Sequence, residues 1–481
     1  MDNVIVTPHS AYVSEEALKE LKTRAAQNVV LALNAEEPRD VVNPEVFALR
    51  GCGRDPSRRS GGGSPGFPDS GGDAGGASAG GTGGSHPGDA PAAGSNGSDD
   101  ASGACFTSSA DTDAGTGGVR WVDLARRHSL DLEEYIPGKP VEQVKRELGL
   151  ERIIKLASNE TTVGPSPLAL EAAEEALSQV NLYPEGDSFE LRLGLAGYLG
   201  VEPGMIVVGN GGDNVITMIG HAFLNEGDEV VLADPTFPVY ESVAKLLGAT
   251  VVKVPLKDYV HDLDAMKRSI TPRTKIVVVC NPNNPTGTIV TKSQMDAFLT
   301  GLPDNVIVVL DEAYWDYVDD PEYPVSIDYI KAGHKVIAVR TFSKIAGLAG
   351  LRIGYAVAPK AAADLLWRVA EPFPVNRLAQ AAARAALRDE SHRNTVLELN
   401  RRGKAYLYGE FRRLGLEYVP THTNFVFVNL KRDSLAVHRE LLKRGIIVRP
   451  GVTWKCPEWI RVTIGTPEET RAFVEALEEV L

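Results

Sequence analysis

One lysine stands out in residues 341–354, "TFSKIAGLAGLRIG", because Lys344 is surrounded by small and apolar residues and Arg352 follows it in the same stretch. A lysine amine acts as a nucleophile or base near neutral pH only where its surroundings lower its pKa from ~10.4. On this stretch alone, a lysine that follows an apolar run is more often a solvated residue at a strand end. The rest of the chain must decide between these two interpretations.

Two polar strings elsewhere have structural explanations as well as chemical ones. In "VVGNGGDNVITMIGHAF", residues 207–223, Gly212 and Asp213 lie between an expected strand and an expected helix. Free N–H groups at a helix start favour a phosphate, although such turns are often glycine-rich for steric reasons alone. In "VCNPNNPTGTIVTKSQ", residues 279–294, Asn284 lies in a string of turn-forming residues that is denser than one turn needs.

A carboxylate ends the apolar run of "VVLDEAYWDYV", residues 308–318. Asp311 could be a helix cap, which is its common role at such a position. It would be functional if it faced a heterocyclic nitrogen that must stay protonated. Tyr314 follows three residues later and would then lie close to the same ligand.

The elements that must position these side chains form an alternating pattern of strands and helices over residues 119–481. Continuous Val/Ile/Leu runs, each followed by a polar or glycine-bearing turn, predict strands in "MIVVGN", "EVVLADP", "KIVVVCNP", "VIVVLDEAY" and "KVIAVRTFS". Strands of this kind need both faces covered, so we expect an α/β fold with a mostly parallel sheet between helix layers. Ligands of such sheets bind at the carboxyl ends of the strands, where all of these polar strings occur.

Composition narrows the function. The formal net charge of −14 argues against a nucleic-acid binder but allows small anionic substrates in a local basic pocket. The four cysteines are far apart, so neither a disulfide framework nor a metal site is expected, and a reducing cytoplasm fits best. No apolar run approaches the ~20 residues that span a membrane, and no basic leader precedes an apolar core.

A linker is expected at residues 50–118. Residues 51–118 hold 21 of the 47 glycines, and between Gly53 and Gly118 there is no Val, Ile, Leu, Met, Trp or Tyr. Such a segment buries too little apolar surface to offset its chain entropy, so it should be disordered. It separates a short head, residues 1–49, with a helix expected from Ser14, from the long body.

The head resembles the C-terminal tail of the D-isomer-specific 2-hydroxyacid dehydrogenases, in which a TPH motif carries a catalytic histidine. His9 matches that histidine. The nucleotide-binding fold and the substrate arginine that it would need are absent, so we expect the head to be a non-catalytic remnant. A gene fusion and a misplaced start codon would both explain it.

The body, residues 119–481, closely resembles the fold-type-I pyridoxal phosphate aminotransferases, specifically the histidinol-phosphate aminotransferases. The resemblance rests on the strings above together with "KLASNETTVGPSP", "NLYPEGDSFELR", "ADPTFPVY", "PFPVNRLAQAAA", "THTNFVFV", "GIIVRPG" and "IRVTIGTPEE". It implies a large cofactor domain at about 165–370 and a smaller α+β domain from about 119–164 plus 371–481. It also implies a homodimer with shared active sites.

The resemblance implies roles for particular residues. Lys344 would bond covalently to pyridoxal 5'-phosphate, Asp311 would keep the pyridine nitrogen protonated, and Tyr314 would act with them in catalysis. The remaining cofactor contacts would come from Gly212, Asp213, Phe237, Asn284, Thr341, Ser343, Arg352 and, in the neighbouring subunit, Tyr183. The substrate would be bound by Tyr135, Asn159, Asn284 and Arg461.

These roles predict a ping-pong transamination between histidinol phosphate and 2-oxoglutarate, with glutamate as the other amino compound. One departure bears on the substrate: the family commonly reads Asn-Glu-Asn-Pro where this chain has Asn159, Glu160, Thr161 and Thr162. An aromatic amino-acid aminotransferase and a phospho-amino-acid decarboxylase therefore stay open as alternatives. A cofactor-free scaffold protein and a 2-hydroxyacid dehydrogenase are alternatives of other classes; the first is disfavoured by the presence of Lys344 and Asp311, and the second draws only on the head.

Overall fold

The structure is a computed structural model that describes residues 119–132 and 141–481. The predictions for the head, the linker and His9 lie outside the described residues, as does Tyr135. The described helices are α3 (Trp121–Leu124), α4 (Val141–Leu148), α5 (Pro167–Ala176), α6 (Phe189–Leu199), α7 (Gly212–Phe223), α8 (Val239–Leu246), α9 (Leu263–Arg268), α10 (Lys292–Leu299), α11 (Ser326–Lys331), α12 (Lys360–Val369), α13 (Arg377–Ala386), α14 (Glu390–Arg413), α15 (Ser434–Lys443) and α16 (Pro467–Val480).

A seven-stranded sheet forms the centre of the larger part of the fold, in the order β2-β8-β7-β6-β5-β3-β4. Its strands are β2 (Ile206–Gly209), β3 (Glu229–Asp234), β4 (Thr250–Pro255), β5 (Thr274–Cys280), β6 (Ile307–Asp311), β7 (Val336–Thr341) and β8 (Gly354–Val357). Strands β3 to β7 pair in parallel, whereas β8 runs antiparallel to both of its neighbours. The five predicted strands are confirmed as β2, β3, β5, β6 and β7.

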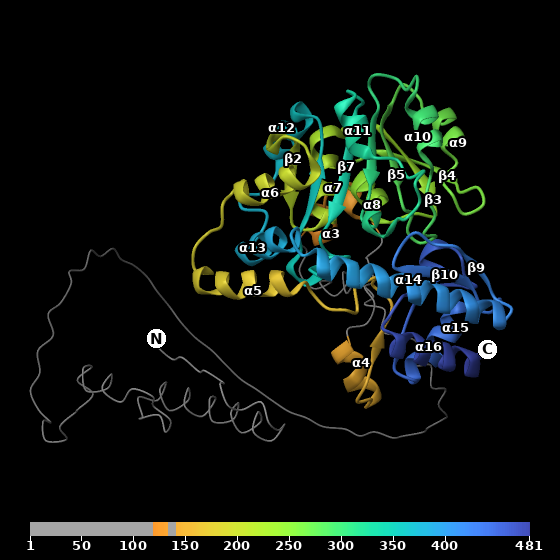
Figure 1. The fold of residues 1–481 in the computed structure, drawn as a ribbon. Coiled ribbons are helices and arrows are strands. Elements are labelled where there is room, and N and C mark those ends of the chain that lie inside the picture. Colours follow the sequence, from red (N-terminus) through yellow and green to blue (C-terminus); the bar gives the residue numbers. More distant parts are fainter. Residues whose placement is uncertain (1–118, 133–140) are drawn as a thin grey trace, which may run out of the picture. The chain divides into compact units, whose positions relative to one another are not determined.

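Helices cover both faces of this sheet, as the continuous apolar runs require. On β6, Val308 and Leu310 belong to one core with residues of α5, α6, α9, α10, α11 and α13. Val309, which points to the opposite face, packs in a second core with residues of α7, α8 and α12. The predicted α/β fold class is therefore confirmed, and Figure 1 shows these helix layers around the sheet.

A smaller antiparallel sheet, in the order β12-β13-β10-β9, lies in the C-terminal part of the chain. Its strands are β9 (Glu417–Val419), β10 (Phe425–Asn429), β12 (Arg449–Pro450) and β13 (Trp459–Thr463), and β1 (Ile154–Lys155) pairs in parallel with β11 (Ile446–Ile447). Helix α14, drawn in blue in Figure 1, packs against β9 and α16, and its Val396 belongs to a core with Tyr314 and Phe425. The domain limits near residues 165 and 371 stay a prediction.

Six short 3-10 helices complete the described elements: η1 (Arg127–Ser129), η2 (Leu177–Gln179), η3 (Pro203–Met205), η4 (Trp315–Tyr317), η5 (Ala349–Leu351) and η6 (Gly451–Trp454). Two of them follow site-bearing strands: η4 comes after β6, and η5 lies in the loop between β7 and β8. Within the described ranges, no helix has both the length and the apolarity needed to cross a membrane.

Candidate functional site

A cavity of about 410 Å³ opens at the carboxyl ends of β5, β6 and β7, where parallel strands gather their following loops. Of the predicted site residues, the cavity brings together Asn159, Gly212, Asp213, Phe237, Asn284, Asp311, Tyr314, Thr341, Ser343, Lys344, Arg352 and Arg461. Tyr183 does not line it; this residue is 79% exposed and stacks on Phe373 with ring centroids 4.6 Å apart.

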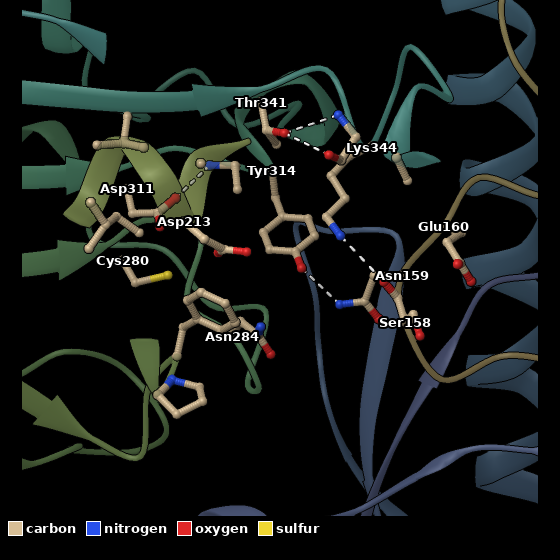
Figure 2. A pocket seen from close by; sticks show the side chains of 18 of the residues that line it. Ser158, Asn159, Glu160, Asp213, Cys280, Asn284, Asp311, Tyr314, Thr341 and Lys344 are labelled. Carbon is tan, nitrogen blue, oxygen red and sulfur yellow. Dashed lines mark hydrogen bonds between the residues drawn. The ribbon is translucent and has the colours of Figure 1, made fainter. Parts of the chain in front are cut away.

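The Lys344 amine lies in the cavity, whose wall includes residues of both sheets. The side chain follows β7, and its Nζ donates to the backbone oxygen of Ser158 at 3.3 Å (Figure 2). Burial lowers the pKa of Lys344 to about 8, and the nearby positive charge of Arg461 acts in the same direction. A substantial fraction of the amine is therefore uncharged near neutral pH, as a nucleophile or base requires.

Asp311 ends β6 and points its carboxyl group into the cavity wall. Tyr240 donates its hydroxyl proton to Oδ2 at 2.5 Å, and the backbone N–H of Ala313 donates to Oδ1 at 3.0 Å. Burial raises the pKa of Asp311 to about 6, although both hydrogen bonds oppose that shift. A buried carboxyl group of this kind is stabilised in its charged form by a cation placed against it.

Tyr314 is buried beside Lys344, whose Nζ lies 5.6 Å from the centre of the tyrosine ring. The ring packs edge-on against Phe425, with centroids 5.2 Å apart. Its hydroxyl accepts a hydrogen bond from Nδ2 of Asn159 at 2.8 Å, which Figure 2 shows as a dashed line. Burial raises the pKa of Tyr314 to about 12, so the phenol keeps its proton at neutral pH.

An anion site is formed where α7 begins. Gly211, at φ 88°, precedes the helix, and a Cβ there would lie 2.6 Å from Nη2 of Arg352. Arg352 itself adopts φ 54° and extends its guanidinium to this helix end. Its Nη2 lies 3.4 Å from Oδ2 of Asp213. The hydroxyl oxygens of Thr341 and Ser343 lie 3.0 Å apart beside this helix end, and both residues line the cavity. Helix N–H groups and a guanidinium together suit a phosphate.

A second basic group lies across the cavity on β13. Arg461 is 7% exposed, and its Nη1 and Nη2 donate to Oδ1 of Asn284 and to the backbone oxygen of Ala157, both at 2.6 Å. The bond to Oδ1 turns the amide nitrogen of Asn284 the other way, where it can donate to a ligand. Arg449 on β12 is the direct strand partner of Arg461 and also lines the cavity.

Sequence reasoning missed two residues of this site. Arg449 lies in the string "GIIVRPG", and its pairing with Arg461 depends on the register of β12 and β13. Tyr240 lies three residues after Phe237 in "ADPTFPVY", and its partner Asp311 is 71 residues away. The signal was present in quoted strings, but the partners were far apart in sequence.

The fold and the site define an aminotransferase: the chain belongs to the aminotransferase class I and II family, whose model matches residues 151–477. More specifically, it is similar to histidinol-phosphate aminotransferases. It is 51% identical to the one from Moorella thermoacetica over 76% of this chain and 94% of that protein. It is 46% identical to the one from Caldicellulosiruptor saccharolyticus over 73% of this chain and 98% of that protein.

This chain is also similar to a solved structure of a histidinol-phosphate aminotransferase. The histidinol-phosphate aminotransferase from Sinorhizobium meliloti, in complex with pyridoxal-5'-phosphate, superposes with a TM-score of 0.67 at 29% identity. The match covers 72% of this chain and 95% of that chain.

Proposed function

We propose that this chain is a pyridoxal phosphate-dependent histidinol-phosphate aminotransferase of histidine biosynthesis. It converts histidinol phosphate and 2-oxoglutarate to imidazole-acetol phosphate and glutamate. The observation that carries the proposal is the convergence, in one cavity, of the Lys344 amine, the Asp311 carboxyl group, an anion site at Arg352 and a separate pair of arginines, Arg449 and Arg461.

The residues present fit pyridoxal phosphate. The start of α7, Arg352, Ser343 and Thr341 would hold its phosphate, and Asp311 would supply the negative partner for a protonated ring nitrogen. Phe237 lines the same cavity and offers an aromatic face for the ring. When bound, the cofactor supplies a carbonyl carbon that bonds amines and a ring that withdraws electrons from the substrate Cα.

The chain's own groups then have defined tasks. Lys344 Nζ, with a pKa of about 8, would take the proton from the substrate Cα and deliver it to the cofactor. Tyr314 and Asn284 would donate hydrogen bonds to the cofactor's phenolic oxygen. Asp311 stays ionised when it faces a cation, because the attraction opposes the effect of burial.

The arginine pair explains how one pocket accepts two different anions. Arg461 can fork onto the phosphate of histidinol phosphate or a carboxylate of glutamate. Arg449 adds a second guanidinium on the adjacent strand, which suits the dianionic phosphate. Asn159 and Tyr135 complete the proposed substrate-binding set, and Asn159 lines the cavity.

The proposed active form is a homodimer in the cytoplasm. Apolar side chains are exposed along α5, η2 and α6, and include Leu170, Leu177, Val180, Leu182, Phe189 and Leu193. A second copy covering this surface would bury Tyr183 and bring it to the partner's cofactor phosphate. The free thiols of Cys280 and Cys456 fit a reducing compartment.

A comparison of kcat/KM for histidinol phosphate, phenylalanine and tyrosine tests the assignment. We expect a clear preference for histidinol phosphate, because the aromatic amino acids leave one guanidinium without an anion. A preference for phenylalanine or tyrosine would instead identify an aromatic amino-acid aminotransferase. Release of CO2 without an oxo-acid product would identify a decarboxylase.

A further inference from the structure

Asn159 is held in an unusual conformation below Tyr314. Asn159 is 1% exposed, and its backbone lies in the left-handed region at φ 56°, which asparagine adopts more readily than most residues. The side chain of Asn424 donates to its backbone oxygen at 3.0 Å. The chain therefore fixes the position of Asn159 before any ligand binds.

Both ends of the Asn159 amide are bonded to protein groups. Oδ1 accepts from Oγ1 of Thr463 at 3.1 Å, and Nδ2 donates to the Tyr314 hydroxyl at 2.8 Å. Thr463 Oγ1 also accepts the backbone N–H of Asn159 at 3.0 Å. Because a backbone N–H can only donate, the threonine has its own proton left for Oδ1, and this orients the amide with its N–H groups toward Tyr314.

The direction of the last hydrogen bond matters for Tyr314. An amide N–H has no lone pair to accept with, so the tyrosine oxygen must accept from Asn159. The phenol has a single proton, which then turns away from Asn159 and toward the cavity. The hydroxyl is thus kept as a donor to whatever oxygen lies there.

We propose that Asn159, oriented by Thr463, is a positioning residue that directs the Tyr314 hydroxyl proton into the cofactor cavity. This inference rests on the proposed function, since the acceptor it requires is the cofactor's phenolic oxygen. Asn159 then acts through Tyr314, in addition to any contact it makes with substrate.

Asn159→Asp tests the direction of this proton. Aspartate has nearly the same shape and tolerates the left-handed backbone, but its carboxylate can only accept hydrogen bonds. The Tyr314 hydroxyl should then donate its proton to the new carboxylate and no longer donate into the cavity. Asn159→Gly is the matched control, because glycine accepts the backbone conformation and removes the amide without attracting the proton.

The readout is the pH midpoint at which the visible absorbance of the bound cofactor changes. A donor to the phenolic oxygen stabilises its negative charge, so loss of the donor should raise this midpoint. We expect a rise of about one pH unit or more in Asn159→Asp and Tyr314→Phe, and a clearly smaller one in Asn159→Gly. A purely structural role predicts the reverse order for the two Asn159 variants, because glycine leaves a cavity and aspartate does not.

Charges near Tyr314 could also move the midpoint, and a double variant separates the two causes. The charges of Arg461, Cys280 and Asp311 act on the pKa of Tyr314, and Nζ of Lys344 lies 5.6 Å from the centre of its ring. In Asn159→Asp/Tyr314→Phe the midpoint should equal that of Tyr314→Phe within a few tenths of a unit, because no tyrosine proton remains to be redirected. If the midpoint of the double variant instead exceeds that of Tyr314→Phe by as much as Asn159→Asp alone exceeds wild type, the aspartate acts through its charge, and the proposal is overturned.

Two further results would be decisive. An unchanged midpoint in Asn159→Asp, in protein that binds the cofactor with a wild-type visible band, would overturn the proposal while leaving the proposed function intact. Failure of the wild-type protein to develop a visible band with pyridoxal phosphate would overturn the proposed function itself. Thermal melting of each apo variant, measured beside these titrations, identifies any variant that fails to fold.

Discussion

The hydroxyl of Tyr240 donates a 2.5 Å hydrogen bond to Oδ2 of Asp311, so one buried phenol contacts a carboxyl group that lines the cavity. This bond stabilises the carboxylate and lowers the pKa of Asp311, against the larger effect of burial that raises it to about 6. Without a cation against it, Asp311 is therefore ionised at neutral pH with only a small margin, and Tyr240 supplies part of that margin.

Tyr240→Phe should move the acid limb of the pH profile upward. Without the hydroxyl donor, the Asp311 pKa rises, so the ionised form is lost at a higher pH as the solution is acidified. We expect the acid-side midpoint of the pH profile of kcat/KM to rise by about one pH unit, with the loss of activity greatest below pH 7. Tyr329→Phe is the control, because its hydroxyl donates in the same way to Asp296, outside the cavity. Equal shifts in both variants would contradict this role.

Lys344→Met should abolish transamination and the covalent attachment of the cofactor, while keeping an unbranched side chain in place. The apo form should be at least as stable as apo wild type at pH 7. The reason is that a pKa lowered from 10.5 to about 8 makes burial of the charged amine unfavourable wherever the unfolded chain is protonated. The stability difference should shrink as the pH rises from 8 to 10.5. Denaturant titrations of the two apo proteins measure it, and wild-type turnover in Lys344→Met would contradict the mechanism.

Arg461→Lys should weaken both half-reactions by roughly tenfold or more, because lysine cannot reproduce the two parallel hydrogen bonds of a guanidinium. The substitution also releases Asn284 and the backbone oxygen of Ala157. Single-turnover rates with histidinol phosphate and with glutamate measure each half-reaction. A loss confined to one substrate would show that Arg461 is not the shared anion site.

Arg449→Lys should separate the two substrates. A phosphate dianion can engage both guanidiniums, whereas a single carboxylate is satisfied by Arg461. We expect kcat/KM for histidinol phosphate to fall by about tenfold and that for glutamate to change by less than threefold. Equal losses would place Arg449 in a structural role on β12.

Deletion of residues 1–118 should leave the specific activity unchanged. Every residue that lines the cavity lies between Ala157 and Arg461, and the family model begins at residue 151. Steady-state assays of the two proteins side by side test this expectation. A large loss, or NADH oxidation by the full chain that depends on His9, would contradict it.

The sequence was most informative where the physics is local. Continuous apolar runs predicted five of the seven strands of the large sheet, and the turns after them predicted where Asp311, Asn284 and Lys344 would meet. The edge strand β4 was missed because its exposed, mixed-polarity residues lack that pattern. β8 was missed because its antiparallel course depends on pairing with β2 and β7.

Side-chain partners were harder to predict than strands. The bond from Asn159 to Tyr314 spans 155 residues, and that from Thr463 to Asn159 spans 304. No periodicity in the chain relates such positions. They are set by how β13 and the loop after β1 pack against the large sheet, and only the three-dimensional structure shows it.

The antiparallel course of β8 has a mechanical consequence. Because β7 and β8 form a hairpin, Lys344 and Arg352 lie on the same loop, between the paired ends Thr341 and Gly354. A molecule bonded to the lysine and gripped by the arginine is pinned at two points of one rigid body, and only rotation about the line through those points remains. Asp311, at the end of the neighbouring strand β6, would remove that rotation if it bonded to the same molecule. The orientation of a ring held in this way would be set by residues of the large sheet and its loops.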